Sequence, residues 1–456
     1  MLGGESEALT TRCLPVTRTL LLNATFAPPC LNTFAGLDEL GLNATGIALL
    51  AGVCVLAAEP VVEDRFCREC GSWAYVRDTV VRELAHVPFG HRPTVLQVRH
   101  RRYQCPGCGH VFRHDLTHAA ASRSRLTQAA VAWALEAVVC DHLSISRVAA
   151  HLRLDWHTVN TAVLAEGYRR LIADQHRLDA VEVLGVDEHV WRHTKTGDKY
   201  VTVMVDLTPV RDKTGPARLL DLVPGRSKQV FKTWLTDQEQ RFRDGVKVVA
   251  MDGFSGFKTA AQEALPDAVT VMDPFHVIQL FADGLDECRR RVQQATTGHR
   301  GRKGDPLFKA RMMLHTGSDL LTEKHHQRLS ALFATSEHKP VETTWCIYQR
   351  AVTAYRLKNK AAGAEYLTEL IDLIAVGVPA GLPELARLGR TLNRRREDIL
   401  AYFTHPGSSN GPCEAINGRV EHLRGTALGF RNLTYYRIRA LLEAGGFRTH
   451  FTHTRD

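Results

Sequence analysis

The sequence predicts a multidomain α/β protein whose main domain is a mixed sheet with helices on its faces. Short apolar stretches alternate with helical periodicity between residues 179 and 276, a long stretch without any strand pattern follows, and two cysteine pairs lie upstream. A chain of 456 residues is long enough for several domains, each with its own core. We predict six segments: a poorly defined lead-in (1–60), a cysteine-paired module (61–118), a helical domain (119–178), the first part of the sheet domain (179–276), an all-helical insertion (277–402) and the second part of the sheet domain (403–456).

The charge and hydropathy of the sequence indicate which kinds of partner and location to expect. The formal net charge is +9 and the isoelectric point is about 9.0, which favours a polyanionic partner. The most apolar run, residues 46–58, is too short to span a bilayer and is expected to be a strand or a buried helix. The chain starts without a charged segment before an apolar core, so we expect no signal peptide, no membrane contact and a cytoplasmic location.

Four of the eleven cysteines form two Cys-x-x-Cys pairs: Cys67 with Cys70, and Cys105 with Cys108. Two such turns bring four thiolates to one tetrahedral ion, so the spacing predicts a zinc ribbon with structural Zn²⁺. A redox dithiol pair and free core cysteines are the alternatives, but neither needs two matched pairs.

Two short helices follow, residues 144–152 and 156–163, joined by a turn. Apolar residues at helical spacing can form their shared core: Ile145, Val148, Leu152, Val159 and Val163. This pattern predicts a helix-turn-helix that binds DNA, although an ordinary helical hairpin looks much the same. The predicted DNA contacts lie in the second helix and in a basic strand between the cysteine pairs: Trp156, His157, Thr158, Asn160, Arg99, Arg101 and Arg102.

Two apolar strands of the predicted sheet lead directly into Asp187 and Asp252, and Glu414 lies far downstream in the first turn of a predicted helix. A carboxylate at the end of a buried strand must be solvated, paired or bound to metal. Two aspartates on neighbouring strand ends and a glutamate on a packed helix predict an oxygen-rich site for Mg²⁺. Glu188 is expected to point to the opposite side of its strand.

Three polar residues are predicted to support these acids. Asp273 and His276 end the next strand, and Asn417 lies one turn beyond Glu414, where it can orient the glutamate. Each acid also has a plain alternative, because carboxylates at turns and helix starts often bond to backbone N–H groups. We favour the metal site because the three acids occur together.

Residues 277–402 show no strand pattern, and helical periodicity is clear in 319–333 and 343–357. Two basic runs lie in this region. Residues 297–306 are either solvated or placed on a phosphate backbone, and residues 392–396 are expected to form a solvated face.

In combination these motifs resemble bacterial insertion-sequence DDE transposases of the ISL-three group. The resemblance covers about residue 66 to the end and is carried by five stretches: Gly185–Glu188, Met251–Gly253, Asp273–Val277, Ser409–Arg419 and Gly429–Asn432. It implies an RNase H-like core interrupted by an all-helical insertion, with Asp187, Asp252 and Glu414 as catalytic metal ligands. Cys413 departs from the pattern, since a small polar residue such as threonine is expected there.

The resemblance implies cleavage at the ends of a mobile element, followed by joining of the freed 3′ ends to new DNA. It implies Mg²⁺ or Mn²⁺ at the acids, double-stranded DNA (terminal inverted repeats and target) as partner, and a homodimer or larger assembly on DNA at the bacterial nucleoid. Two other classes stay open: a DNA-binding regulator without chemistry, which the three acids argue against, and a metal-dependent nuclease that joins no strands.

Overall fold

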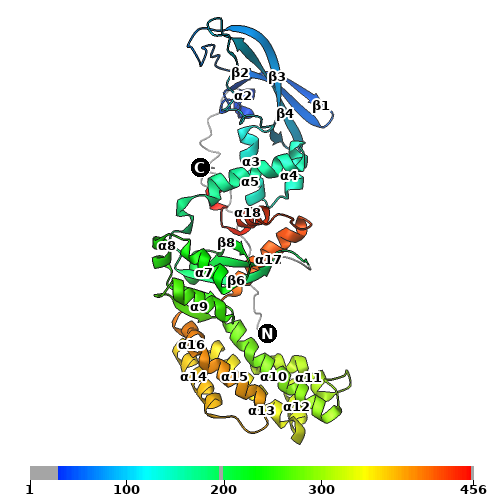
Figure 1. Cartoon of the computed structure of the whole chain (residues 1–456). Helices are drawn as coiled ribbons and strands as arrows, with labels where there is room; N and C mark the ends of the chain where they lie inside the picture. The colour runs from blue at the N-terminus through cyan, green and yellow to red at the C-terminus, as the bar shows by residue number, and fades with distance from the viewer. Residues whose placement is uncertain (1–28, 195–198, 453–456) are drawn as a thin grey trace. The chain divides into compact units, whose positions relative to one another are not determined.

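The computed structural model describes residues 29–194 and 199–452. They fall into two compact units (Figure 1), which are described separately. The first takes its described residues from Met1–Ala134 and Ser146–Val159, and the second from Leu135–Ile145 and Asn160–Asp456. Within the described ranges, no helix is both long and apolar enough to cross a membrane.

The first unit is built on a five-stranded sheet with the order β1-β2-β4-β3, in which β5 pairs with β4. Its elements are α2 (Leu31–Phe34), β1 (Leu42–Leu50), β2 (Val53–Pro60), β3 (Tyr75–Phe89), β4 (Arg92–Gln104) and β5 (Val111–Arg113). The apolar run 46–58 therefore forms an antiparallel hairpin rather than one strand or helix. Strand β2 pairs in parallel with β4, so the domain boundary predicted after residue 60 falls inside this sheet and must move upstream.

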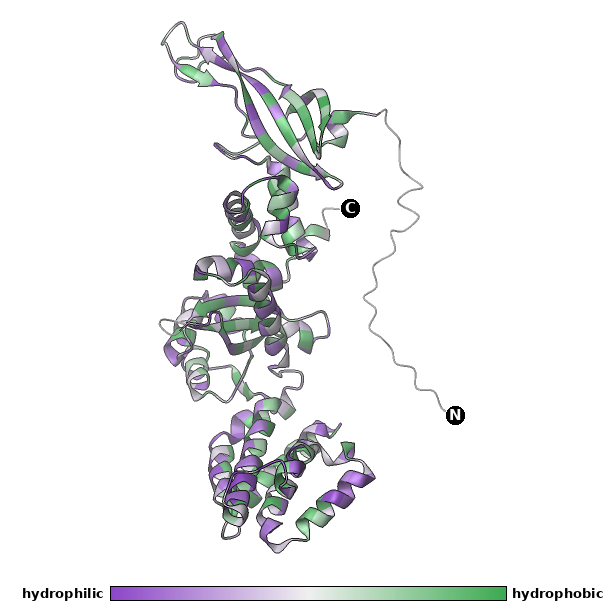
Figure 2. Ribbon diagram, turned by 90° about the vertical axis from the view of Figure 1, so that its right-hand side faces the viewer, coloured by the Kyte–Doolittle hydropathy of each residue, from purple (hydrophilic) through white to green (hydrophobic). Residues whose placement is uncertain are grey.

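The strands of this sheet alternate between buried and exposed residues, as a sheet with one packed face requires. Figure 2 shows the resulting short bands of hydrophobic and hydrophilic residues. Leu56, Leu84 and Leu96 are fully buried in its core. His86 is also buried and contacts the Thr127 hydroxyl at 3.0 Å and the Ala35 carbonyl at 2.8 Å, so the segment before α3 is tied to the sheet.

Three helices follow: α3 (Gln128–Val139), α4 (Ile145–Leu152) and α5 (Trp156–Gly167). The apolar residues predicted to form the helix-turn-helix core are all buried: Ile145, Val148, Leu152, Val159 and Val163. Arg153 begins the turn between α4 and α5 with a φ of +52°, and the Asp155 carboxylate caps α5 by accepting from the Thr158 backbone N–H at 2.8 Å.

The second unit contains a five-stranded sheet with the order β10-β9-β6-β7-β8. Its strands are β6 (Val183–Val190), β7 (Tyr200–Asp206), β8 (Arg218–Pro224), β9 (Val248–Met251) and β10 (Val269–Met272). Strands β6, β7 and β8 form an antiparallel meander, whereas β6, β9 and β10 run parallel. The mixed sheet predicted from the order of elements is therefore present.

The two faces of this sheet serve different purposes. Leu184 and Val186 join a core with the helices α7 (Lys228–Thr236), α8 (Gln240–Gly245) and α9 (Ser255–Ala264). Because side chains alternate along a strand, Gly185 and Asp187 face the other way. That face is covered by α17 (Gly411–Thr426) and α18 (Leu433–Ala444).

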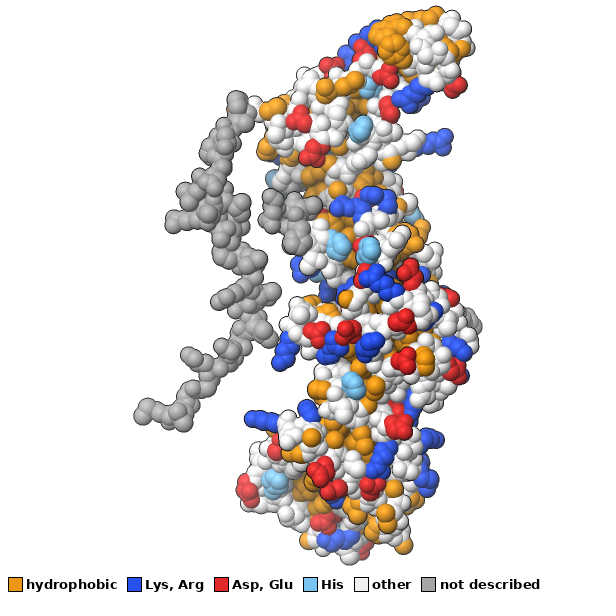
Figure 3. Space-filling model, turned by 90° about the vertical axis from the view of Figure 1, so that its left-hand side faces the viewer, with side chains coloured by type: hydrophobic (Ala, Val, Ile, Leu, Met, Phe, Trp, Pro, Cys, Tyr) orange, Lys and Arg blue, Asp and Glu red, His pale blue; other side chains and the backbone are white. Residues whose placement is uncertain are grey.

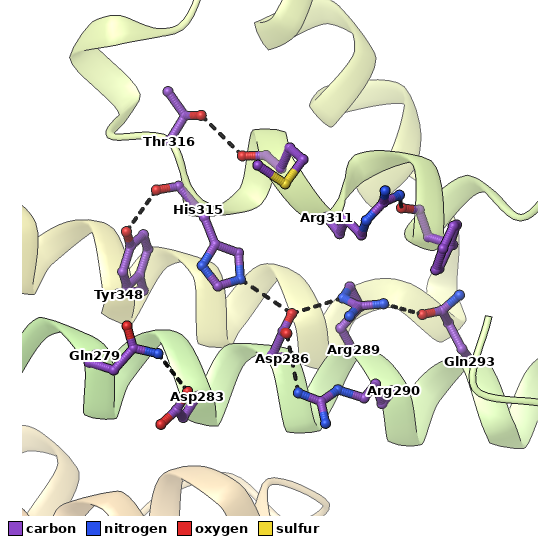
Figure 4. A network of polar contacts seen from close by, with 12 residues as sticks. Gln279, Asp283, Asp286, Arg289, Arg290, Gln293, Arg311, His315, Thr316 and Tyr348 are labelled. Atoms are coloured by element: carbon purple, nitrogen blue, oxygen red, sulfur yellow. Dashed lines mark hydrogen bonds and ion pairs between the residues drawn. The ribbon is translucent and has the colours of Figure 1, made fainter. Parts of the chain in front are cut away.

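Residues 277–402 contain helices joined by loops and no strand, as predicted. The helices are α10 (Pro274–Thr297), α11 (Pro306–His315), α12 (Glu323–Phe333), α13 (Lys339–Arg356), α14 (Lys360–Val376), α15 (Pro383–Arg394) and α16 (Arg396–Thr404), and they share one large apolar core. The Asp286 carboxylate on α10 accepts from Arg289, Arg290 and His315, which ties α10 to the end of α11 (Figure 4). The hydrogen bond with His315 is the largest cause that holds the pKa of Asp286 far below its usual range, and the two arginines act in the same direction.

The remaining short elements connect these parts. They are the π-helix Tyr168–Ile172, the short helices α6 (Thr208–Arg211) and α19 (Thr449–Thr452), and the 3-10 turns Gln175–Leu178, Ser318–Leu320 and Ser336–His338.

Candidate active site and metal centres

The four predicted zinc ligands lie together in the first unit. Their sulfur atoms are all within 4.8 Å of one another. The Sγ atoms of Cys67 and Cys108 are 3.6 Å apart, and those of Cys70 and Cys105 are 3.3 Å apart. Thiolates at the corners of a zinc tetrahedron, each about 2.3 Å from the metal, are about 3.8 Å apart. The cluster is therefore compatible with a structural zinc ion.

Each cysteine pair is shaped by its own turn. Gly71 and Gly109 follow the second cysteine of each pair with φ values of +73° and +74°, a conformation that favours glycine. Their N–H groups donate to the carbonyls of Cys67 and Cys105 at 2.8 and 3.0 Å. Hydrogen bonds with Ser72 lower the pKa of the Cys70 thiol to about 6, whereas hydrogen bonds with the other thiols of the cluster raise that of Cys108.

The predicted DNA contacts are only partly available at the surface. Trp156 and His157 are exposed, whereas Thr158 is half-buried and its hydroxyl donates to Asp155 at 2.7 Å. Asn160 is only 3% exposed, so its prediction as a DNA contact is wrong: it lies on the inner side of α5. On β4, the predicted contacts are Arg99, which is exposed, and two residues in ion pairs, Arg101 with Glu63 and Arg102 with Asp78.

Charge on the surface is mixed. On the face drawn in Figure 3, Lys and Arg side chains are interspersed with Asp and Glu rather than gathered into one patch. The net charge of +9 therefore marks no single DNA-binding surface on this face.

In the second unit, strand register brings the predicted acids into one row. Val186 pairs with Met251 across β6 and β9, and Met251 pairs with Met272 across β9 and β10. The next residue on each strand is an aspartate: Asp187, Asp252 and Asp273. Neighbouring strands are about 4.8 Å apart, so the three aspartates lie side by side at the carboxyl edge of the parallel strands.

The charges of the other two predicted ligands act on the carboxyl group of Asp187. Burial raises the pKa of its carboxyl to about 6, and the negative charges of Asp252 and Glu414 act in the same direction. Hydrogen bonding to the Glu188 N–H (2.8 Å) and the proximity of His276 act against the rise. The three acids thus share one electrostatic environment, although β6, β9 and α17 are far apart in the sequence.

Asn417 orients an acid other than the predicted one. Its Nδ2 donates to Asp187 Oδ2 at 3.0 Å and lies 3.5 Å from the Glu188 carbonyl. The sequence predicts that it orients Glu414, which lies one turn earlier on the same helix. Sequence spacing along α17 favours the neighbour on the helix, but packing against β6 presents Asp187 instead. Glu188 points away, as predicted, and pairs with Arg226.

Asp273 serves to hold backbone. It is 2% exposed, and Oδ2 accepts from the N–H groups of Phe275 and His276 at the start of α10. Oδ1 accepts from the Asn410 N–H at 2.6 Å, just before α17. Asp273 thus ties the row of aspartates to the helix that carries Glu414, which agrees with a supporting role.

The helical insertion also reaches the site. Arg395 Nη1 donates to the carbonyl of Gly253, directly after Asp252, at 2.9 Å. Arg395 and Lys258 both bind the carboxylate of Asp398, which is 1% exposed. Arg395 itself is 6% exposed, so the expectation that residues 392–396 form a solvated face fails at this position. Sequence reasoning missed this contact because a run of arginines carries no signal of burial.

Cys413 fills a space that glycine leaves open. A Cβ atom at Gly185 would lie 2.4 Å from Cys413 Sγ and 2.9 Å from Leu207 Cδ1. The start of α17 therefore packs directly on β6, two residues before Asp187. Burial raises the pKa of the Cys413 thiol well above its usual range, so this sulfur is neutral and acts in packing.

The acidic residues fit divalent metal. Carboxylate oxygens are the ligands Mg²⁺ prefers. The pKa of Asp187 is raised chiefly by burial and also by the charges of Asp252 and Glu414, and a bound cation would favour the charged form. Across the described ranges, only the four cysteines form a group of three or more ligand atoms within 4.8 Å. Asp187, Asp252 and Glu414 do not form such a group in this structure.

The sequence matches two family models and is similar to curated transposases. A family model for transposases matches residues 184–440, and a second, the helix-turn-helix domain of transposase family ISL3, matches residues 117–165. The transposase for insertion sequence element IS1001 of Bordetella parapertussis is 25% identical over 393 residues, which cover 84% of this chain and 90% of the relative. The transposase for IS1557 of Mycobacterium tuberculosis (strain CDC 1551 / Oshkosh) is 26% identical over 423 residues, covering 84% and 86%.

The first family model spans more than half of the chain, including the row of aspartates, α17 and most of α18. The second coincides with α3, α4 and most of α5 and implies DNA binding. The chain belongs to the ISL3 family of insertion-sequence transposases.

Proposed function

We propose that this protein binds the ends of an insertion sequence and catalyses metal-dependent DNA cleavage and strand transfer. Asp187, Asp252 and Glu414 are the proposed catalytic residues. The observation that carries the proposal is the register that aligns Asp187 with Asp252, combined with the influence of Glu414 on the Asp187 carboxyl. Three carboxylates from separate elements repel one another in this environment, and bound divalent cations would offset that repulsion.

The three carboxylates would hold two Mg²⁺ or Mn²⁺ ions, which when bound stabilise the attacking and leaving oxygens of an in-line phosphoryl displacement. The chain's own part is positioning. Asn417 fixes the Asp187 carboxylate, Arg395 fixes the backbone after Asp252, and Asp273 fixes the approach to α17. The cysteine cluster would hold Zn²⁺ as a structural ion that shapes the β3–β4 region.

The architecture and assembly are part of the same proposal. The strand order β8-β7-β6-β9-β10 and the all-helical insertion before Glu414 support an RNase H-like core made of residues 179–276 and 403–456. We propose double-stranded DNA, as terminal inverted repeats and target, as the partner. Two element ends must meet for joining, so we propose a homodimer or larger assembly on DNA.

The test mixes purified protein with DNA carrying the element's terminal repeats in Mg²⁺, alongside an Asp252→Asn variant. The wild type is expected to give nicked and joined products, and the variant to bind the same DNA without cutting it. A loss on the order of a thousandfold or more is expected when a metal-binding catalytic carboxylate is removed.

Other outcomes separate the alternatives. Nicking without joining would indicate a nuclease, and specific binding without cleavage in Mg²⁺ and in Mn²⁺ would indicate a regulator. Equal cleavage by wild type and Asp252→Asn would contradict the assignment of the acids.

A further inference from the structure

Two phenylalanine rings beside the acidic row are left open to solvent. Phe254 is 42% exposed and Phe275 is 61% exposed. An exposed aromatic ring is ordinary by itself. These two differ because Phe254 lies two residues after Asp252 and Phe275 two residues after Asp273, so both adjoin the proposed site of cleavage.

The two rings occupy equivalent positions just beyond the ends of neighbouring strands, at the starts of α9 and α10. Met251 pairs with Met272, and each phenylalanine is three residues further along its chain segment. Each backbone is held in the same way, because the Phe254 N–H donates to Asp252 Oδ1 at 2.8 Å and the Phe275 N–H donates to Asp273 Oδ2 at 3.0 Å. The same short motif, Asp-x-Phe, therefore presents an aromatic ring at two adjacent strand ends.

Local packing keeps the rings in place without covering them. Phe254 meets the buried Phe257 edge to face, with ring centroids 5.0 Å apart, and lies over Gly256. A Cβ atom at Gly256 would be 2.3 Å from the Phe254 ring, so a side chain there would make the ring shift from this position. Phe275 follows Pro274 in the first turn of α10 and meets the His276 ring edge to face at 5.7 Å.

We propose that Phe254 and Phe275 stack on nucleobases next to the scissile phosphate, which rests on the proposed function of this site. Acids that would hold metal bring the phosphate backbone to the strand ends, and its bases then lie within reach of side chains two residues away. Every base offers a π-face, so stacking holds the strand with little dependence on sequence. This suits a site that must accept both an element end and a target.

The test combines protein and DNA variants. We expect Phe275→Ala and Phe254→Ala each to slow cleavage of terminal-repeat DNA by about ten- to a hundredfold, the range for loss of one base–aromatic stack. Phe275→Trp, which keeps a stacking ring, should stay within a few fold of wild type. Met312→Ala removes a side chain that is 72% exposed on α11 of the insertion, and it should change nothing.

An abasic nucleotide is then placed at each position flanking the cleavage site. At one position the wild type should lose about as much activity as Phe275→Ala does on intact DNA, and the two losses together should not add. Phe275→Ala should keep the wild-type melting temperature, since its ring is 61% exposed. Phe254→Ala also loses the contact with Phe257 and should lower the melting temperature slightly.

Additive losses at every abasic position, or wild-type activity in both alanine variants, would overturn the inference. So would a loss of self-association instead of base dependence, which would indicate a protein partner. These failures require a wild type that cleaves in Mg²⁺, whereas a wild type that does not cleave contradicts the proposed function itself.

Discussion

The cysteine cluster and the acidic cluster are built in opposite ways. Each cysteine pair closes within a single turn, and its glycine and backbone hydrogen bonds lie inside that turn. The acids come from β6, β9 and α17, and they meet only because a strand register, Asn417 and Arg395 join distant segments. The geometry of each cysteine pair therefore depends on residues within its own turn. The geometry of the acidic cluster depends on side chains, such as Asn417 and Arg395, that are not themselves proposed metal ligands. Variants that remove a contact from each site test this difference.

The largest effect is expected at the local site. Cys67→Ser should abolish zinc binding and unfold the region around β3 and β4, because structural zinc contributes roughly 10–16 kcal/mol of binding free energy. Zinc content by atomic emission and hydrogen exchange of the two strands measure this. The acidic site lies in the other unit, so Mg²⁺ should still raise the melting temperature of the second unit.

The matched control is Cys30→Ser, which changes an exposed cysteine outside the cluster and should leave zinc content unchanged. Full zinc content in Cys67→Ser would contradict a four-cysteine site.

The next largest effect is expected where Asp398 of the helical insertion binds Arg395 and Lys258. Asp398→Ala leaves the charges of Arg395 and Lys258 buried without their partner, which should cost about 3–5 kcal/mol of unfolding free energy. Cleavage should fall as well, since Arg395 holds the carbonyl that follows Asp252. Chemical denaturation and the cleavage assay measure the two effects.

Asp372→Ala provides the comparison. Asp372 pairs with Arg396, beside Arg395, but is more than half exposed, so its loss should cost roughly 0–1 kcal/mol. Equal destabilisation by the two alanine variants would show that the buried contact has no special weight.

A smaller effect is expected where α17 meets β6. Gly185→Ala places a methyl group against Cys413 Sγ and should cost about 1–3 kcal/mol by overpacking. It should also reduce cleavage, because α17 carries Glu414 and Asn417. Adding Cys413→Ala should restore part of both losses, and a double-mutant cycle measures this coupling.

Gly418→Ala tests the same helix at a position with no atom within 4 Å, where alanine should be neutral or slightly stabilising. Independent, additive effects of Gly185→Ala and Cys413→Ala would contradict the proposed packing.

The same contrast explains what the sequence could predict. The cysteine site could be predicted because the spacing within each Cys-x-x-Cys pair fixes how its two thiols are placed. The apolar runs before Asp187 and Asp252 likewise indicated two strands of the sheet. Contacts between residues far apart in the sequence have no comparable sequence pattern. Asn417 reaches Asp187 rather than Glu414, and Arg395 is buried within a run of arginines.

Burial was also hard to judge within a single helix or hairpin. Asn160 is polar and near the start of α5, yet it faces inward. Residues 46–58 are apolar throughout, and a turn at Gly52 with a φ of +79° divides them into two strands. Hydropathy alone does not show which partner strand will cover such a run.

The central claim is that Asp187, Asp252 and Glu414 form one divalent-ion site, and the Asp187 carboxyl tests it most directly. Its pKa of about 6 lies above the ordinary 3.8, so the folded protein holds a proton that the unfolded chain releases between these values. Without metal, the unfolding free energy should therefore fall as the pH rises through this window, by at most about 3 kcal/mol.

The measurement is denaturation of wild type and Asp187→Asn at pH 4 and pH 8, in EDTA and in Mg²⁺. In EDTA at pH 8 the variant should be more stable than wild type by about 1–3 kcal/mol, and this advantage should vanish near pH 4. Mg²⁺ should stabilise the wild type at pH 8 and leave the variant nearly unchanged. Equal stabilisation of both proteins by Mg²⁺, with no advantage of the variant in EDTA, would contradict a metal site at these acids.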